Sequence, residues 1–318
     1  MTKSILLMYS NYRPGEKHMN RLRNIAAGFE IRSAQSEEHA VSAAPQAEVI
    51  VGHRYLRQTL PHAQQLKFVQ ISGSGFDHLP WQELKDRRIT LARTTFASKV
   101  IAQHAYVLAW ALIRQLPQCL TAQARRQWDT GLYDTFLPWP RTALIFGLGS
   151  IGVCLSELLK SAGLTVWGVN TSGAQRGQCN GVFELNAWKE ILPRTDMLFL
   201  TCPLNENTRN IIDAGVLASL PGHALVVNVA REGVLDTAAL IQCLKDGKLG
   251  GAALDVFDRR PLTADDPLWQ TPNLIITPYL AGRYVERAGD FERFVEEQLQ
   301  RYVSDTELLN VIDWEEIC

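Results

Sequence analysis

Short apolar segments alternate with helix-length segments along most of the chain. Such segments, when they end in polar or glycine-containing turns, are typical of strands buried on both faces of a parallel sheet. A first series lies at residues 4–8, 49–52 and 68–72. A second series lies at residues 142–146, 164–169, 197–201, 225–229, 252–256 and 273–277. Two series predict two α/β units.

Two longer segments have the pattern of helices. Residues 98–116 are mostly apolar, and we expect this helix to end before Pro117, because proline cannot continue a helix. A second helix is expected at about residues 284–303. The intervening residues 128–141 contain Pro138 and Pro140 and predict a loop.

Composition narrows the class of protein. The 318 residues carry 32 Lys and Arg against 33 Asp and Glu, a formal charge of −1 that argues against nucleic-acid or anionic-membrane partners. A hydrophobic content of 46% provides enough material for buried cores, and no apolar run reaches the roughly 18 residues of a membrane span. The six cysteines lack metal-ligand spacing. We therefore expect a soluble, cytoplasmic protein without a metal site.

The strongest local signal is a glycine motif. Gly147, Leu148, Gly149, Ser150, Ile151 and Gly152 form a G-x-G-x-x-G directly after an apolar strand and at the start of a helical pattern. Its glycines permit a tight turn and a close approach of the backbone to a pyrophosphate at the helix N-terminus. In this strand–turn–helix context the motif predicts a dinucleotide site.

The choice between NAD and NADP depends on the end of the next strand. NAD sites place an acidic residue about 20 residues further on, where it holds the ribose hydroxyls. This chain has Asn170 there, followed by Thr171, Ser172 and Arg176. Hydroxyl groups and a guanidinium favour a 2′-phosphate, so NADP is slightly favoured. The alternative is that Asn170 binds the ribose of NAD and that Arg176 is a solvated loop residue.

Several ordered motifs resemble those of a known family, the D-isomer-specific 2-hydroxyacid dehydrogenases, which include glyoxylate/hydroxypyruvate reductases. The resemblance extends from about residue 49 to residue 313. The segments that carry it are residues 66–79 (LKFVQISGSGFDHL), 147–152 (GLGSIG), 202–210 (CPLNENTRN), 227–240 (VNVAREGVLDTAAL), 251–262 (GAALDVFDRRPL), 277–282 (TPYLAG) and 309–313 (LNVID).

The resemblance implies a particular architecture. A Rossmann cofactor domain of residues 99–283 would be inserted in a discontinuous, flavodoxin-like substrate domain of residues 1–98 and 284–318, both doubly wound parallel sheets. The active site would lie in the cleft between them. A homodimer would form through the segment that holds Trp110, Trp128 and Trp139, although core packing explains these residues equally well.

The resemblance also implies site residues beyond the glycine motif. Arg54 and the loop of Ser74, Gly75 and Phe76 would bind the substrate, the loop through its backbone N–H groups. The remaining cofactor contacts would be Cys202, Pro203, Thr208, Val229, Ala230, Asp255 and Ala281. Asp255 would lie near the nicotinamide carboxamide, although a structural role at a strand end is the alternative.

The catalytic positions match the family only in part. Arg231 occupies the arginine position of the VNxAR motif, where a planar guanidinium grips the carboxylate and carbonyl of a 2-oxoacid. Tyr279 stands where the family has its histidine acid–base group, and Arg260 stands where the family has the glutamate that supports it. The two changes are coherent, because without an imidazolium no carboxylate is needed beside it.

These departures leave three hypotheses. The leading one is an NAD(P)-dependent reductase of a small 2-oxoacid, in which Tyr279 donates the proton. The second is a catalytically weak or inactive dinucleotide-binding sensor or scaffold, in which Tyr279 fills space and Arg260 faces solvent. The third is a reductase of a dianionic substrate that Arg260 binds directly. If Arg231 and Arg260 converged on Tyr279, they would favour its phenolate form. His78 and His104 are weaker candidates for a substitute acid.

Overall fold

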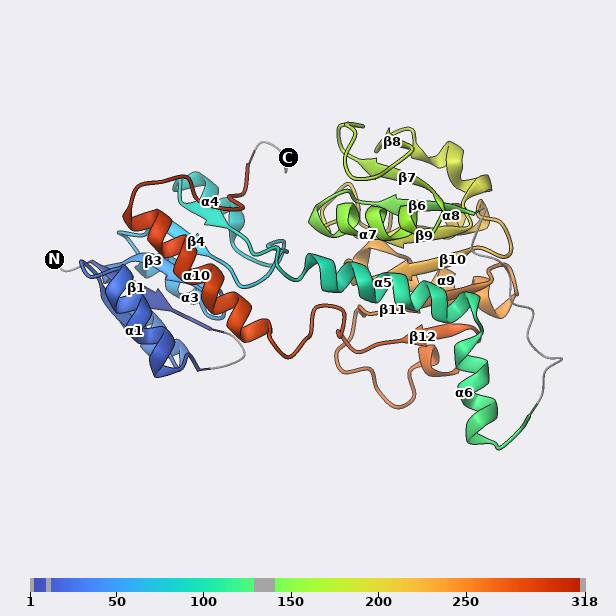
Figure 1. The fold of residues 1–318 in the computed structure, drawn as a ribbon, viewed down its shortest axis with the longest axis horizontal. Helices are drawn as coiled ribbons and strands as arrows, with labels where there is room; N and C mark the ends of the chain where they lie inside the picture. Colours follow the sequence, from blue (N-terminus) through green and yellow to red (C-terminus); the bar gives the residue numbers. More distant parts are fainter. Residues whose placement is uncertain (1–2, 10–12, 129–140, 315–318) are drawn as a thin grey trace. The chain divides into compact units, whose positions relative to one another are not determined.

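The computed structural model describes residues 3–9, 13–128 and 141–314. The chain divides into two compact units, each built on one parallel sheet (Figure 1). Unit 1 consists of Met1–Ala97 and Tyr284–Cys318, and unit 2 consists of Ser98–Arg283. Among the described residues, no helix is both long enough and apolar enough to span a membrane.

Unit 1 holds a five-stranded sheet in the order β2-β1-β3-β4-β5, the order of flavodoxin-like folds. Its strands are β1 (Ser4–Leu7), β2 (Glu30–Ser33), β3 (Ala47–Val51), β4 (Phe68–Gln70) and β5 (Thr90–Ala92). The three predicted strands are confirmed, whereas β2 and β5 were missed. Both are edge strands, and β2 is half-exposed while β5 has only three residues, so neither shows a continuous apolar run.

Helices cover both faces of the unit 1 sheet. The helices are α1 (Glu16–Ile25), α2 (Glu37–Ala43), α3 (Leu56–Thr59), α4 (Trp81–Asp86) and α10 (Arg287–Val303). One face packs against α1 and α10, which lie side by side in Figure 1, and the other packs against α2, α3 and α4. The buried Gln298 of α10 donates to Gln70 Oε1 (2.8 Å) and accepts from Leu309 N (2.8 Å). The expected C-terminal helix is confirmed, and it completes the core of unit 1.

Unit 2 holds a seven-stranded parallel sheet in the order β12-β11-β10-β9-β6-β7-β8. Counted from β6, this is the Rossmann order with one further strand beyond β11. The strands are β6 (Thr142–Phe146), β7 (Thr165–Asn170), β8 (Gly181–Glu184), β9 (Met197–Leu200), β10 (Leu225–Asn228), β11 (Gly251–Leu254) and β12 (Leu274–Ile276). The six predicted strands are confirmed. The edge strand β8 was missed, because it is half-exposed and pairs only with β7.

The helix expected over residues 98–116 is confirmed but ends at Ile113, and a second helix that was not predicted follows it. The first helix, α5 (Ser98–Ile113), is followed by Gln115 in the left-handed region (φ 54°), and α6 (Leu116–Ala124) begins there. Pro117 lies in the first turn of α6, where its missing N–H costs nothing, so it belongs to the start of the second helix. The loop expected around Pro138 and Pro140 lies outside the described residues.

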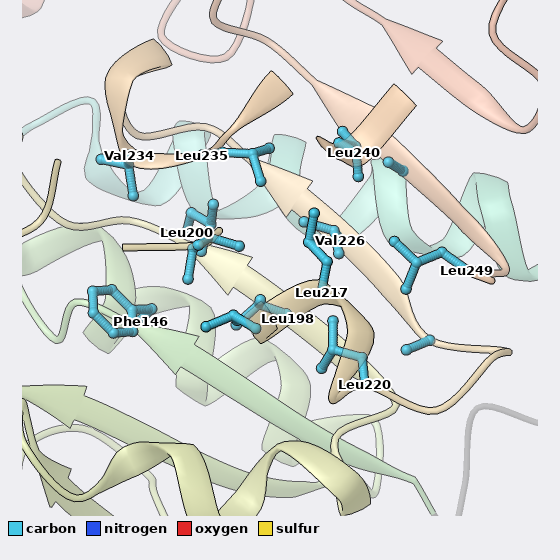
Figure 2. Packing of buried hydrophobic residues seen from close by; sticks show 14 of the residues in the cluster. Phe146, Leu198, Leu200, Leu217, Leu220, Val226, Val234, Leu235, Leu240 and Leu249 are labelled. Carbon is cyan, nitrogen blue, oxygen red and sulfur yellow. The ribbon is translucent and has the colours of Figure 1, made fainter. Parts of the chain in front are cut away.

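The other helices of unit 2 pack on the two faces of its sheet. They are α7 (Ser150–Ser161), α8 (Ala214–Ala218) and α9 (Thr237–Lys245). The described residues also form short 3-10 helices, η1 (Ala44–Gln46) and η2 (Leu60–His62) in unit 1 and η3 (Trp188–Arg194), η4 (Glu232–Val234) and η5 (Pro267–Gln270) in unit 2. Figure 2 shows the core on the α8–α9 face, where Leu198, Leu200 and Val226 of the sheet meet Leu217 and Leu240. The opposite face is covered by α5 and α7.

A buried carboxylate at the end of β11 fixes the segment that follows β12. Asp255, 3% exposed, accepts hydrogen bonds from Thr277 Oγ1 (2.6 Å) and Leu280 N (2.8 Å) on Oδ1, and from Ala281 N (3.0 Å) on Oδ2. Its carbonyl also accepts from Tyr279 N (3.2 Å). We call residues 277–281 with Asp255 the aspartate clamp. The clamp holds Tyr279 in the left-handed region (φ 57°), a conformation that an aromatic residue adopts only when its surroundings enforce it.

The aspartate clamp predicts a large effect of a small substitution. Asp255→Asn replaces one acceptor oxygen by an N–H donor, which then faces a donor from the clamp. We expect the free energy of unfolding to fall by about 2 kcal/mol, the usual cost of leaving a buried donor without its charged acceptor. Urea denaturation measures this loss. Asp258→Asn, on the exposed residue three positions later, is the control, and equal stability of the two variants would contradict the clamp.

Candidate active site

The predicted cofactor residues of unit 2 follow neighbouring strands at one edge of its sheet. The parallel register pairs Phe146 with Leu200, Leu200 with Asn228, and Asn228 with Leu254. The residues after these strand ends therefore meet at the carboxyl edge, where open α/β sheets bind their ligands. Those residues are the glycine motif after β6, Cys202 and Pro203 after β9, Val229, Ala230 and Arg231 after β10, and Asp255 after β11.

The glycine motif forms a turn with an open centre. Gly147 has φ 110°, and a Cβ there would lie 2.5 Å from Cys202 N, while a Cβ on Gly152 would lie 2.1 Å from Gly147 O. Only glycine fits these two positions. A Cβ on Gly149 would meet nothing within 4 Å, so the backbone faces open space at this point. Leu148, by contrast, is buried in the core, and Ile151 is half-buried.

The N-terminus of α7 fits an anionic ligand. Gly149 is its N-cap residue, and no side chain caps the helix. The first N–H groups of a helix lack partners within the helix, and with the helix dipole they attract a phosphate. The Ser150 hydroxyl accepts from Ser98 Oγ (2.9 Å), which fixes it at this turn. The open glycine and the uncapped helix together fit the pyrophosphate of a dinucleotide.

The loop after β7 presents polar groups to solvent. Asn170 donates from Nδ2 to Ala174 O (2.9 Å), and this bond closes the loop. Thr171, Ser172 and Arg176 are exposed on it. Within the described part of the chain, Arg176 has no ion-pair partner. The loop therefore carries a guanidinium that is available to an anion.

The segment after β9 is ordered by its own hydrogen bonds. The Thr208 hydroxyl donates to Pro203 O (2.8 Å), and Thr208 is buried. Burial raises the pKa of the Cys202 thiol to about 12. The thiol therefore stays protonated and unreactive at neutral pH, which excludes a nucleophilic role.

Arg231 follows β10 at the centre of the carboxyl edge. Its Nη1 donates to Ala230 O (2.8 Å), and its carbonyl accepts from Asn228 Nδ2 (3.1 Å). The Asn228 side chain also accepts from Ala230 N (3.0 Å), so one buried amide braces the turn on both sides. Val229 and Ala230 are buried. Arg231 is thus held by a rigid turn, with its side chain half-buried.

Tyr279, Arg260 and Glu232 form one cluster. The Tyr279 hydroxyl donates to Glu232 Oε2 (3.0 Å). The Arg260 Nη2 donates to both Glu232 oxygens (3.1 Å each), and the guanidinium carbon lies 3.4 Å from the centroid of the Tyr279 ring. The side chains of Arg260 and Glu232 are 51% and 28% exposed. We call these three residues the tyrosine cluster.

The sequence left open whether Arg260 faces solvent, binds a dianionic substrate or lies close to Tyr279. The Arg260 guanidinium covers the face of the Tyr279 ring as a cation–π partner and pairs with the Glu232 carboxylate. The same carboxylate accepts the hydrogen bond of the phenol. Glu232 was missed in the sequence. The sequence feature that could have identified Glu232 is its position directly after Arg231, close to the end of a strand.

His104 belongs to the aspartate clamp. Its Nε2 lies 3.0 Å from Thr277 Oγ1 and 3.6 Å from Asp255 Oδ1. Because Thr277 gives its only hydroxyl proton to Asp255, the contact with His104 requires an N–H on Nε2. Burial lowers the pKa of His104, and the Asp255 charge opposes that shift. His104 therefore supports the clamp as a neutral donor.

The substrate candidates of unit 1 gather at the carboxyl edge of its own sheet. Val51 pairs with Gln70, so the residues after β3 and after β4 are neighbours. Ser72 Oγ lies 3.4 Å from His53 Nδ1, and Arg54 lies over the Tyr55 ring at 5.2 Å. Ser74 and Gly75 are half-buried. This edge also holds His78, whose ring packs edge-on against His53 at 5.3 Å.

Two of these unit 1 residues have roles set by burial. Phe76 is 9% exposed and packs in the core against Trp314, so only its backbone can serve a ligand. Burial, reinforced by the neighbouring His78, lowers the pKa of His53 to about 4. His53 is therefore neutral at physiological pH.

One group of possible metal ligands occurs among the described residues, in unit 1. Atoms of His18, Glu292 and Glu296 lie within 4.8 Å of one another. His18 is 1% exposed, and its ring nitrogens already contact Tyr9 Oη (2.8 Å) and Glu296 Oε1 (2.5 Å). Both nitrogens are in use, so the geometry describes a buried hydrogen-bond network between α1 and α10.

Comparisons with known proteins agree with this geometry. The NAD-binding domain of the D-isomer specific 2-hydroxyacid dehydrogenases matches residues 106–281, more than half of the chain. A D-3-phosphoglycerate dehydrogenase of Methanocaldococcus jannaschii is 28% identical over 289 residues, which are 89% of this chain and 55% of that protein. The chain thus spans about half the length of this relative.

Solved structures resemble the chain over nearly its whole length. An NADPH-dependent glyoxylate/hydroxypyruvate reductase from Sinorhizobium meliloti, in complex with NADP and sulfate, is 25% identical with a TM-score of 0.83 and 99% of each chain covered. A D-isomer specific 2-hydroxyacid dehydrogenase from Xanthobacter autotrophicus, in complex with NADPH and MES, is 25% identical with a TM-score of 0.81 and 98% of each chain covered. The chain therefore belongs to the D-isomer specific 2-hydroxyacid dehydrogenase family.

Proposed function

We propose that this protein is an NAD(P)-dependent reductase of a small 2-oxoacid. The observation that carries the proposal is the carboxyl edge of the unit 2 sheet. There, an open glycine turn at an uncapped helix follows β6, and Arg231 follows β10, with only β9 between these two strands. A dinucleotide needs the first feature and a carboxylate substrate needs the second.

The roles of the residues follow from their chemistry. Arg231 grips the carboxylate and carbonyl oxygen of the oxoacid, and the backbone of Ser74, Gly75 and Phe76 contributes N–H donors from unit 1. Tyr279 exchanges the proton at the substrate oxygen. The nicotinamide, when bound, supplies the hydride. Unit 2 is the cofactor domain and unit 1 the substrate domain.

A dianionic substrate is not favoured by the tyrosine cluster. Glu232 neutralises Arg260 at 3.1 Å, so this guanidinium is not free to attract a second anionic group. The proposed substrate is therefore a monocarboxylate, such as glyoxylate or hydroxypyruvate.

NADP is the proposed cofactor, in preference to NAD. Residues 171–180, directly after β7, include no acidic residue, and the exposed hydroxyls of Thr171 and Ser172 lie on the same loop as Arg176, which has no ion-pair partner among the described residues. These groups suit a 2′-phosphate. Complexes of two related structures with NADP and NADPH support the same choice.

We further propose that the protein is a cytoplasmic homodimer that associates through α5 and α6. The α6 helix has no buried residue, and Leu116 and Leu120 are 48% and 64% exposed. Val107 of α5 and Trp128 are also exposed, at 59% and 95%. A second copy of the same surface would bury these apolar side chains, as in most symmetric oligomers.

The first test is turnover. We expect loss of reduced nicotinamide when the protein meets glyoxylate or hydroxypyruvate, followed by cofactor absorbance. Arg231→Lys keeps the positive charge but loses the paired N–H donors of the planar guanidinium, so kcat/KM should fall about 100-fold. Arg194→Lys, on an exposed residue, is the control and should not change kcat/KM. Cofactor binding without turnover across the panel would contradict the reductase and support a dinucleotide-binding sensor or scaffold.

The second test concerns the cofactor. Arg176→Glu replaces an attraction for the 2′-phosphate by a repulsion, so NADPH affinity should fall about tenfold while NADH affinity stays constant. Titration of nicotinamide fluorescence measures both. Arg194→Glu makes the same charge change elsewhere on the unit 2 surface and is the control. Tighter binding of NADH than of NADPH by the unmodified protein would contradict the proposed preference for NADP.

The third test concerns association. Leu120→Lys puts a charge on the exposed apolar face of α6, and sedimentation velocity should show a shift from dimer to monomer. Val285→Lys changes an equally apolar residue that is 94% exposed in unit 1, and it should leave the dimer intact. A monomeric unmodified protein at micromolar concentration would refute the dimer.

A further inference from the structure

Glu232 lies at the centre of the tyrosine cluster, and the function proposed above gives it no role in proton transfer. Its carboxylate accepts from Tyr279 Oη at 3.0 Å and from Arg260 Nη2 at 3.1 Å. It begins η4, directly after Arg231, so the rigid turn that presents Arg231 also positions Glu232. The side chain is 28% exposed, which leaves it in reach of water.

The direction of the hydrogen bond defines what Tyr279 can do. A phenol carries one proton, and here that proton points to Glu232. The lone pairs of the oxygen are then left to accept a hydrogen bond from a third group. In this arrangement Tyr279 is set to receive a proton, and the carboxylate behind it is set to take the proton that the phenol releases.

We propose that Tyr279 and Glu232 form a two-residue proton relay, in which Tyr279 contacts the substrate oxygen and Glu232 is the terminal acceptor. This inference rests on the proposed function. In alcohol oxidation, the substrate O–H bond breaks and its proton passes to Tyr279 Oη. The phenol O–H bond breaks at the same time and that proton passes to Glu232 Oε2. The carbon that bears the substrate oxygen would give its hydride to an oxidised nicotinamide, where one is bound, and a carbonyl would form.

Reduction runs the same steps in reverse. The Glu232 carboxyl group gives its proton to Tyr279 Oη, and the phenol gives its own proton to the oxygen of the carbonyl that receives the hydride from the reduced nicotinamide. Glu232 is then ionised and exchanges protons with water. Its partial exposure permits this exchange.

Arg260 is the positioning residue of the relay. It contacts both oxygens of Glu232 and covers the ring of Tyr279, so one guanidinium holds donor and acceptor in register. Two other charged groups lie around the η4 turn. Arg231 precedes Glu232, and Arg209 lies close to Gly233, where a Cβ added to the glycine would be 3.5 Å from Arg209 Nη1.

The test compares pH profiles of kcat/KM in both directions for the unmodified protein, Glu232→Gln, Tyr279→Phe and the double variant. Glu232→Gln can still accept a hydrogen bond from the phenol but takes no proton. Its oxidation rate should fall about 100-fold near neutral pH and recover only toward about pH 10, where an ordinary phenol ionises. The double variant should be no slower than Tyr279→Phe, because the two residues act as one unit.

Controls separate the relay from a structural role. Cofactor affinity, measured by nicotinamide fluorescence, should be equal in all variants, and Glu190→Gln on an exposed residue should keep the unmodified pH profile. Glu232→Asp keeps a carboxylate and should keep the shape of the profile at a lower rate. It also serves if Glu232→Gln does not fold.

Two results would count against the relay, and they are distinguishable. An unchanged pH profile in Glu232→Gln, or losses that multiply in the double variant, would overturn the relay while the unmodified protein still turned over. Absence of turnover by the unmodified protein in both directions would overturn the proposed function and the relay with it.

Discussion

The carboxylate of Asp255 is the constraint on which the carboxyl edge of unit 2 depends. It is almost completely buried, and it is tolerated there because three donors from one short segment satisfy it. The same bonds hold Tyr279 in a backbone conformation that it would not adopt alone. Asp255 therefore has a structural role at this edge, since its hydrogen bonds determine where the backbone of Tyr279 lies.

The sequence predicted the interior of both sheets because interior strands carry their own signal. Strands such as β9 and β10 are buried along their whole length, so every residue in them is apolar or nearly so. Edge strands such as β2 and β8 have partners on one side only, and their mixed composition resembles that of a loop. The glycine motif was also predicted, because the backbone at Gly147 and Gly152 leaves no room for a Cβ and therefore requires glycine.

The tyrosine cluster was readable only in part. The sequence showed that Tyr279 and Arg260 depart from the family pattern, and it suggested that the two changes belong together. It did not show that Glu232 joins them, because that contact links positions 28 and 47 residues away through the fold. A carboxylate absent from one segment of a motif can thus be supplied by another segment.

The division of the chain also bears on how the protein is made. Unit 2 is one uninterrupted segment, whereas the core of unit 1 includes Phe291, Val295 and Leu299 of α10 packed against Ile5 and Leu7 of β1. During synthesis from the N-terminus, unit 2 can therefore complete its core while residues 1–97 of unit 1 still lack α10. The exposed face of the unit 1 sheet must wait for residues near the end of the chain. This interval makes the early strands of unit 1 the part of the nascent protein most in need of protection from aggregation.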